Sequence, residues 1–124
     1  MSPLICIAVA AFLEARGEGP DGMLAVADVV MERVEDSRWP DDPCKVVRQR
    51  GQFAYLPFSQ VEEIIRAEDD ASWSMALDAS RAVLAGDGLD MGATHFHWIN
   101  ENPYWTKDAI LVGRMGDHLF WRMK

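Results

Sequence analysis

A chain of 124 residues, of which 49% are hydrophobic and 26% charged, suits one domain over residues 1–124 with a single core, and it is too apolar to be disordered. The balance of 12 Lys and Arg against 20 Asp and Glu gives a formal net charge of −8. We therefore exclude a nucleic-acid partner, because neutralising phosphates needs clustered basic residues.

The N-terminal third predicts two helices of different character. The stretch from Leu4 to Leu13 is apolar on nearly every face, so we expect a central helix with Ser2 as its cap. It lacks a basic leader and is too short to cross a bilayer, which argues against an export signal and a membrane span. The second helix, over residues 20–36, carries an apolar stripe at spacings of three and four residues: Met23, Ala27, Val30 and Val34.

The middle of the chain predicts three more helices. Asp42 is a suitable cap for a short helix that runs to about residue 49, with Pro43 in its first turn. The segment Ser59-Gln-Val-Glu62 has the spacing of a capping box and should open the next helix. The fifth helix is expected over residues 72–85, where a Gly-Asp-Gly sequence ends it.

After Gly92 the pattern changes from helical to alternating. Residues 94–99 alternate and are rich in aromatic side chains, and shorter alternating stretches follow at 110–114 and 118–121. Each of these is typical of a strand. Five helices followed by three strands predict a segregated α+β fold, mainly helical, with a small antiparallel sheet near the C-terminus.

The two cysteines, Cys6 and Cys44, form neither a CxxC motif nor a disulfide framework. Because Cys6 lies in an apolar stretch, we expect it to be a buried thiol. A bridge between the two is an alternative that their spacing leaves open.

Glu14 is the first candidate for catalysis. It lies at the C-terminal end of the most apolar helix, where burial and the helix dipole both disfavour a charged carboxylate. Both effects raise its pKa toward the range of a general acid. Glu18 is a candidate second carboxylate, since glycoside hydrolysis usually needs a pair. The alternatives are a solvated helix-end acid for Glu14 and a first-turn acid of the second helix for Glu18.

The three histidines form a candidate zinc site. His95 and His97 share one side of the predicted strand, and His118 is available as a third ligand. The alternative is that these rings hydrogen-bond or stack within the sheet. We favour that alternative, so no metal or cofactor is predicted.

The aromatic residues near the C-terminus divide into two groups. We expect Phe96, Trp98 and Phe120 in the core. Tyr104 and Trp105 flank an Asn-Pro turn, and we favour a sugar-binding groove for them, because aromatic rings stack on the C–H surfaces of sugars.

Several motifs follow one another in a specific order. Ala11-Phe-Leu-Glu-Ala-Arg-Gly-Glu18 comes first, and a helix with Gly22-Met-Leu-Ala-Val-Ala-Asp-Val-Val30 follows it. Shorter pieces succeed these at residues 39–40, 44–47, 49–53, 93–97, 103–105 and 116–120. In this order the motifs resemble the SleB/CwlJ-type cell wall hydrolases, the family of spore cortex-lytic enzymes and related phage endolysins. The resemblance covers most of the chain outside residues 56–92.

The resemblance implies a lysozyme-like, lytic transglycosylase-like domain in which Glu14 is the catalytic acid/base. It implies cleavage of peptidoglycan glycan strands between N-acetylmuramic acid and N-acetylglucosamine. A lytic transglycosylase would leave a 1,6-anhydro-muramic acid product and consume no water. For substrate binding we predict Gln52, Phe53, His95 and Trp105, which fall in the matching motifs, together with Tyr104.

Three other functions stay open. They are a hydrolytic muramidase in which Glu18 or another acid positions water, a zinc-dependent hydrolase that uses the three histidines, and a wall-binding module without catalysis. We expect a monomer that is made in the cytoplasm, carries no signal peptide and reaches the cell wall through a separate pore protein. A phage endolysin fits that context, and so does a bacterial or prophage-encoded enzyme.

Overall fold

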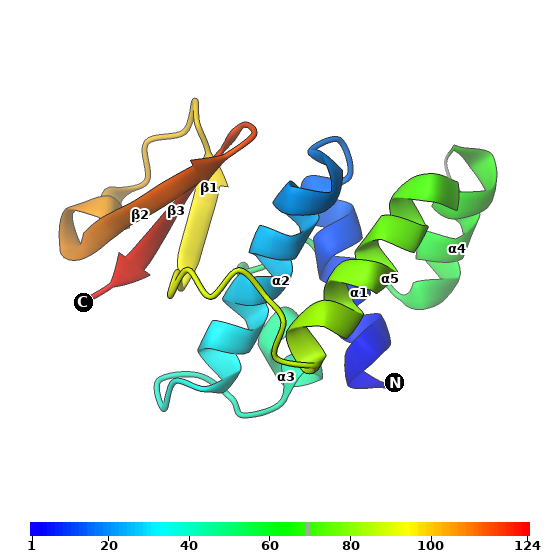
Figure 1. Ribbon diagram of the computed structural model, residues 1–124, viewed down its shortest axis with the longest axis horizontal. Coiled ribbons are helices and arrows are strands. Elements are labelled where there is room, and N and C mark those ends of the chain that lie inside the picture. The colour runs from blue at the N-terminus through cyan, green and yellow to red at the C-terminus, as the bar shows by residue number, and fades with distance from the viewer. Residues whose placement is uncertain (69) are drawn as a thin grey trace.

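The computed structural model describes residues 1–68 and 70–124 of the chain. Within these residues the α-helices and a three-stranded sheet lie at opposite ends of the molecule (Figure 1). The elements in chain order are α1 (Pro3–Ala15), α2 (Gly19–Val34), α3 (Pro43–Val47), α4 (Phe58–Ala67), α5 (Asp70–Leu84), β1 (His95–Trp98), η1 (Tyr104–Asp108), β2 (Ala109–Met115) and β3 (His118–Met123). The predicted α+β arrangement is confirmed, and the 3-10 helix η1 is an addition to it.

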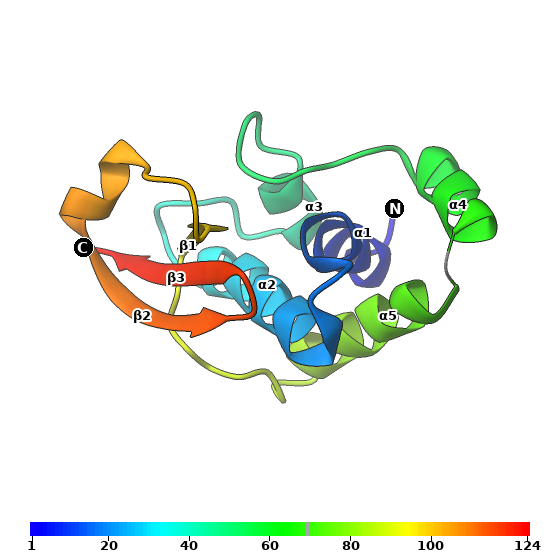
Figure 2. The same cartoon turned by 90° about the horizontal axis from the view of Figure 1, so that it is seen from above.

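The helix α1 is central and packs against α2, α3 and α5, as the view from above shows (Figure 2). Ser2 caps it as predicted and accepts a hydrogen bond from the backbone N–H of Ile5 (3.3 Å). Residues 6–12 are fully buried, so α1 is a core helix. Within the described ranges, every helix falls short of the combined length and hydropathy that a bilayer span requires. These surroundings fix the last turn of α1, which carries Glu14.

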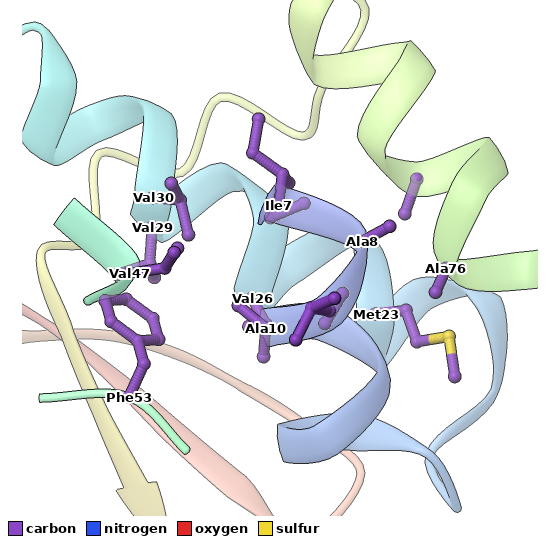
Figure 3. Close-up of a cluster of buried hydrophobic side chains, with 14 of the residues drawn as sticks. Ile7, Ala8, Ala10, Met23, Val26, Val29, Val30, Val47, Phe53 and Ala76 are labelled. Atoms are coloured by element: carbon purple, nitrogen blue, oxygen red, sulfur yellow. The ribbon is translucent and has the colours of Figure 1, made fainter. Parts of the chain in front are cut away.

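The core takes side chains from α1, α2, α3 and α5 (Figure 3). From the predicted stripe of α2, Met23, Ala27 and Val30 are fully buried, and Val34 is partly buried at the edge. Burying one Val or Met side chain contributes about 1.5–3 kcal/mol. The α1–α2 pair is therefore held mainly by apolar contact.

The starts of α3 and α4 have different causes. At α3 the side chain of Asp42 accepts a hydrogen bond from the backbone N–H of Cys44 (3.0 Å), as predicted. The helix α4 begins at Phe58 without a side-chain cap, so the predicted capping box at residues 59–62 is wrong. Pro57 holds extended backbone (φ −55°, ψ 144°) directly before α4, and this fixed residue sets the start of the helix.

A disulfide joins α1 to α3. It links Cys6 to Cys44, whose Cα atoms lie 5.2 Å apart. The expected buried thiol at Cys6 is therefore wrong, and the alternative bridge is correct. Sequence spacing did not show it, because the two residues meet only when α3 packs on the first turns of α1.

The sheet has the order β1-β3-β2, and both pairs of neighbours are antiparallel. The register pairs His95 with Trp121 and Trp98 with His118. Cross-strand partners share a face of the sheet, and successive residues alternate between faces. His118 therefore lies on the face opposite to His95 and His97.

Candidate active site

Glu14 lines a cavity between the end of α1 and the sheet. This Glu14 cavity has a volume of about 360 Å³. Its wall comes from three parts of the chain: α1, the loop that follows α3, and β1 with its following turn and neighbouring strand. Besides Glu14 it is lined by Gly51, Gln52, Phe53, Ala54, Phe96, His97, Trp98, Glu101 and His118. The predicted acid/base is thus half-buried at a hollow that is open to a ligand.

Burial raises the pKa of Glu14 above its ordinary value. The negative charge of Glu101 raises the pKa further, while a hydrogen bond from the backbone of Ala54 opposes the rise. The rise expected from the sequence is confirmed, and desolvation is its main cause. A carboxyl group in this state holds its proton at higher pH than a solvated one and can donate it to a bound substrate.

Glu18 has a different environment, although it follows Glu14 by one turn's length of sequence. Both of its carboxylate oxygens accept from the backbone N–H of Asp117, at 3.1 Å each. Its Oε1 also lies 2.8 Å from Nδ1 of His118, a contact that becomes an ion pair only when the imidazole is protonated. Gly116 has a positive φ of 55°, and a Cβ there would clash with the Glu18 carboxylate. Glu18 therefore clamps the β2–β3 turn and does not line the Glu14 cavity.

Glu101 is the second carboxylate among the described residues that line the Glu14 cavity, and from the sequence alone its segment is expected only as a turn. Its Oε1 accepts from the backbone N–H of Trp98 (2.9 Å), which holds the exposed side chain toward β1. A carboxylate directly after an aromatic strand was the signal that could have identified it. The structure therefore brings Glu14 together with Glu101, and not with Glu18.

The histidine rings contact neighbouring residues of the sheet. His97 accepts from Nε1 of Trp121 at its Nε2 (3.0 Å), and its Nδ1 lies 2.7 Å from the carbonyl oxygen of Trp98. These contacts engage both ring nitrogens and fit one neutral tautomer. Burial, with help from Arg33 and Arg38, lowers the pKa of His95 to about 4, so this ring is neutral near pH 7.

The zinc alternative loses its ligand set in this structure. His118 lies on the sheet face opposite to His95 and His97. Across the described residues, no three His, Cys, Asp or Glu side chains come together as a metal site. The hydrogen-bonded and stacked arrangement that we favoured for the histidines is the one observed.

A second cavity adjoins the first. This Arg33 cavity has a volume of about 470 Å³ and shares Gly51, Gln52 and Phe96 with the Glu14 cavity. Its remaining lining residues are Arg33, His95, Tyr104, Trp105 and Met123. Of the predicted substrate-binding residues, Phe53 lines the first cavity, Gln52 lines both, and His95, Tyr104 and Trp105 line the second.

Of the three aromatic residues predicted to lie in the core, only Phe120 is fully buried. Phe120 is fully buried as expected, but Trp98 is 45% exposed and lines the Glu14 cavity. Phe96 is half-buried and lines both cavities. Tyr104 is 83% exposed, so its ring is available for stacking. Trp98 lies outside the core because it is the last residue of β1, at the edge of the Glu14 cavity.

Comparison with known proteins gives a family match and two structural matches. A family model described as Cell Wall Hydrolase matches residues 17–121, a range that begins three residues after Glu14. A spore cortex-lytic enzyme of Halalkalibacterium halodurans is 31% identical over 117 residues, which are 92% of this chain and 33% of that protein. The chain thus spans about a third of the length of this curated relative.

Two solved structures have the same fold. One is the catalytic domain of the germination-specific lytic transglycosylase SleB from Bacillus anthracis (TM-score 0.75, 20% identity, 97% of this chain and 93% of that chain). The other is the catalytic domain of the Bacillus cereus SleB protein (TM-score 0.75, 21% identity, 97% and 89%). At these identities the likeness shows the fold, and it confirms the predicted fold class.

Proposed function

Because this chain belongs to the cell wall hydrolase family, we propose that it cleaves the glycan strands of peptidoglycan with Glu14 as the catalytic acid/base. One observation carries the assignment: the half-buried Glu14 carboxyl, whose pKa is raised, lines a cavity between the helices and the sheet. The names of the relatives, a spore cortex-lytic enzyme and a lytic transglycosylase, support the same reaction class.

The reaction we propose is lytic transglycosylation. Glu14 donates its proton to the glycosidic oxygen as the bond from that oxygen to C1 of the muramyl sugar breaks. The Glu14 carboxylate then accepts the proton of the muramyl 6-hydroxyl as that oxygen bonds to C1. The product carries a 1,6-anhydro ring, and no water is consumed. This reaction needs only one carboxyl group. Glu18 is therefore not required for it, and its carboxylate instead contacts Asp117 and His118.

A hydrolytic muramidase is the second candidate, and Glu101 is the observation that favours it. This carboxylate lines the same cavity as Glu14 and could position a water molecule on the opposite side of the bond. The two reactions differ in their products, because hydrolysis leaves a reducing muramic acid that is one water heavier than the anhydro sugar.

The test is a digest of purified peptidoglycan with the wild type, Glu14→Gln and Glu62→Gln, read by mass spectrometry of the soluble fragments. We expect anhydro-muramic ends from the wild type and from Glu62→Gln, which alters an exposed acid on α4. Glu14→Gln should release none. Equal release by Glu14→Gln would refute the role of Glu14, and reducing ends would move the assignment to the muramidase. Binding to sacculi without release would leave a wall-binding module.

We propose further that the folded enzyme acts outside the reducing cytoplasm. The Cys6–Cys44 disulfide supports this, since disulfides persist in oxidising surroundings. Synthesis in the cytoplasm followed by release through a separate pore protein, as for an endolysin, is compatible with a bridge that closes after export. Trapping free thiols in cells before and after lysis tests this order, and a bridge already closed in intact cells would contradict it.

A further inference from the structure

Arg33 is a buried cation, and the described part of the chain gives it no acidic partner. Only 3% of the residue is exposed. Its Nε donates to the carbonyl oxygen of Thr94 (2.7 Å), and its Nη1 donates to Oε1 of Gln52 (3.1 Å). Among the described residues, no Asp or Glu forms an ion pair with it. A guanidinium has five N–H donors, so most of them are left for another acceptor.

The charge of Arg33 persists despite this burial. Desolvation lowers its pKa to about 10, so the guanidinium is still protonated near pH 7. The rings of Trp39 and Phe53 lie against it, each with its centroid 5.1 Å from the guanidinium carbon. Such contacts offset part of the cost of burying a cation, but they supply no negative charge.

Arg38, which contacts the same Trp39 ring as Arg33, is an arginine that does have an acidic partner. It stacks on the same Trp39 ring at 4.8 Å, but it is exposed and forms an ion pair with Asp36 (2.8 Å). Both arginines contact Trp39, but only Arg38 forms an ion pair with a described acidic residue. The unpaired one is the one that lines a cavity.

The Arg33 cavity is suited to an anion. No carboxylate occurs among the described residues that line it, whereas the adjoining Glu14 cavity holds both Glu14 and Glu101. His95, with its lowered pKa, is neutral there, so Arg33 is the cation that the described lining residues supply. The amide of Gln52 lies between the two cavities and is held by Arg33.

We propose that Arg33 and Gln52 form a carboxylate-binding subsite next to the catalytic cavity. It takes a carboxylate of the substrate strand, while Tyr104 and Trp105 cover the apolar part of the same group. The inference rests on the proposed function, since peptidoglycan carries carboxylates on its peptide stems, and on the lactyl groups of its muramyl sugars once the stems are removed. Binding there would set which sugar of the strand faces Glu14.

The first test compares three substrates: intact peptidoglycan, the same material with its carboxylates converted to amides, and glycan stripped of its stems. We expect amidation to raise the wild-type KM about tenfold, which corresponds to about 1.4 kcal/mol, with kcat changed little. Arg33→Gln should bind intact and amidated material equally, and the matched variant Arg38→Gln should keep the difference. Stripped glycan tests the second source: a low KM shows that the subsite also accepts a lactyl carboxylate, and a high KM restricts the subsite to the stem.

A second measurement does not depend on catalysis or on the folding of a variant. In the wild type, acetate at constant ionic strength should shift the guanidinium Nη–H resonances of Arg33 and leave those of Arg38 unmoved. If acetate shifts the Arg33 resonances but no glycan is cleaved, the carboxylate site stands and its assignment to peptidoglycan falls. If glycan is cleaved while neither amidation nor acetate has an effect, the subsite is refuted and the proposed function stands.

Discussion

Nδ1 of His118 lies 2.8 Å from Oε1 of Glu18, and both side chains are almost completely buried. The contact joins the corner between α1 and α2 to the first residue of β3. Burial lowers the pKa of His118, and the Glu18 carboxylate opposes that shift. Glu14 and Glu18 lie in one short motif, yet the first faces a cavity and the second holds the sheet against the helices.

Replacing Glu18 tests this division of roles. Glu18→Ala removes the acceptor of the Asp117 N–H and the partner of His118, so it should destabilise the fold by about 2 kcal/mol. Urea unfolding gives the free energy, and the folded fraction should keep most of its kcat. A Glu18 variant that is fully stable but inactive would instead make Glu18 the second catalytic carboxylate.

Removing the charge of Glu101 should alter the pH profile. Glu101 raises the pKa of Glu14, so Glu101→Gln should lower that pKa. A general acid must be protonated to act, so the high-pH limb of the kcat/KM profile should move to lower pH, with little change on the acid side. Glu63→Gln, on α4, is the control. A loss of about a hundredfold or more at every pH would mark Glu101 as the base of a muramidase.

The features that could be predicted from the sequence are local ones. The cap at Ser2, the apolar stripe of α2 and the alternation of residues 94–99 each depend on neighbours a few residues apart. The apolar run before Glu14 likewise predicted the burial of the Glu14 carboxyl and the direction of its pKa shift. The start of α4 was not predicted correctly, because the helix begins directly after the rigid Pro57 and not at the capping box of residues 59–62.

The features that could not be predicted join distant segments. Asp117 donates to Glu18 across 99 positions, and Arg33 donates to Thr94 across 61. The two cysteines meet across 38 positions, and neither spacing nor composition distinguishes such a bridge from two buried thiols. The pleat of the sheet separated His118 from His95, a result that depends on the β1–β3 register.

Loss of the disulfide should cost stability and activity together. Closing a loop of 38 residues stabilises the fold by about 4 kcal/mol in the chain-entropy description. The double variant Cys6→Ala, Cys44→Ala should unfold at correspondingly lower urea, and its activity should fall because α3 leads into the loop that lines the Glu14 cavity. Dithiothreitol should weaken the wild type and leave the double variant unchanged. Two titratable thiols in the native protein would contradict the bridge.

Neutralising Glu14 should stabilise the protein near neutral pH. Its pKa in the folded state lies above the ordinary value of 4.5, so the folded state binds the proton more tightly than the unfolded state. The resulting stability is complete below pH 4.5 and is lost as the pH rises through the raised pKa. Glu14→Gln keeps the shape without the charge and avoids this loss.

We therefore expect Glu14→Gln to be more stable than the wild type at pH 7 and equally stable at pH 4. A difference of about 1 kcal/mol would raise the Tm of a domain of this size by roughly 4 °C. Calorimetry at both pH values measures it, with the exposed Glu62→Gln as the control. A gain at pH 7 together with lost cleavage would mean that the buried carboxyl is kept for chemistry at a cost in stability. A wild type as stable as the variant at both pH values would contradict the raised pKa.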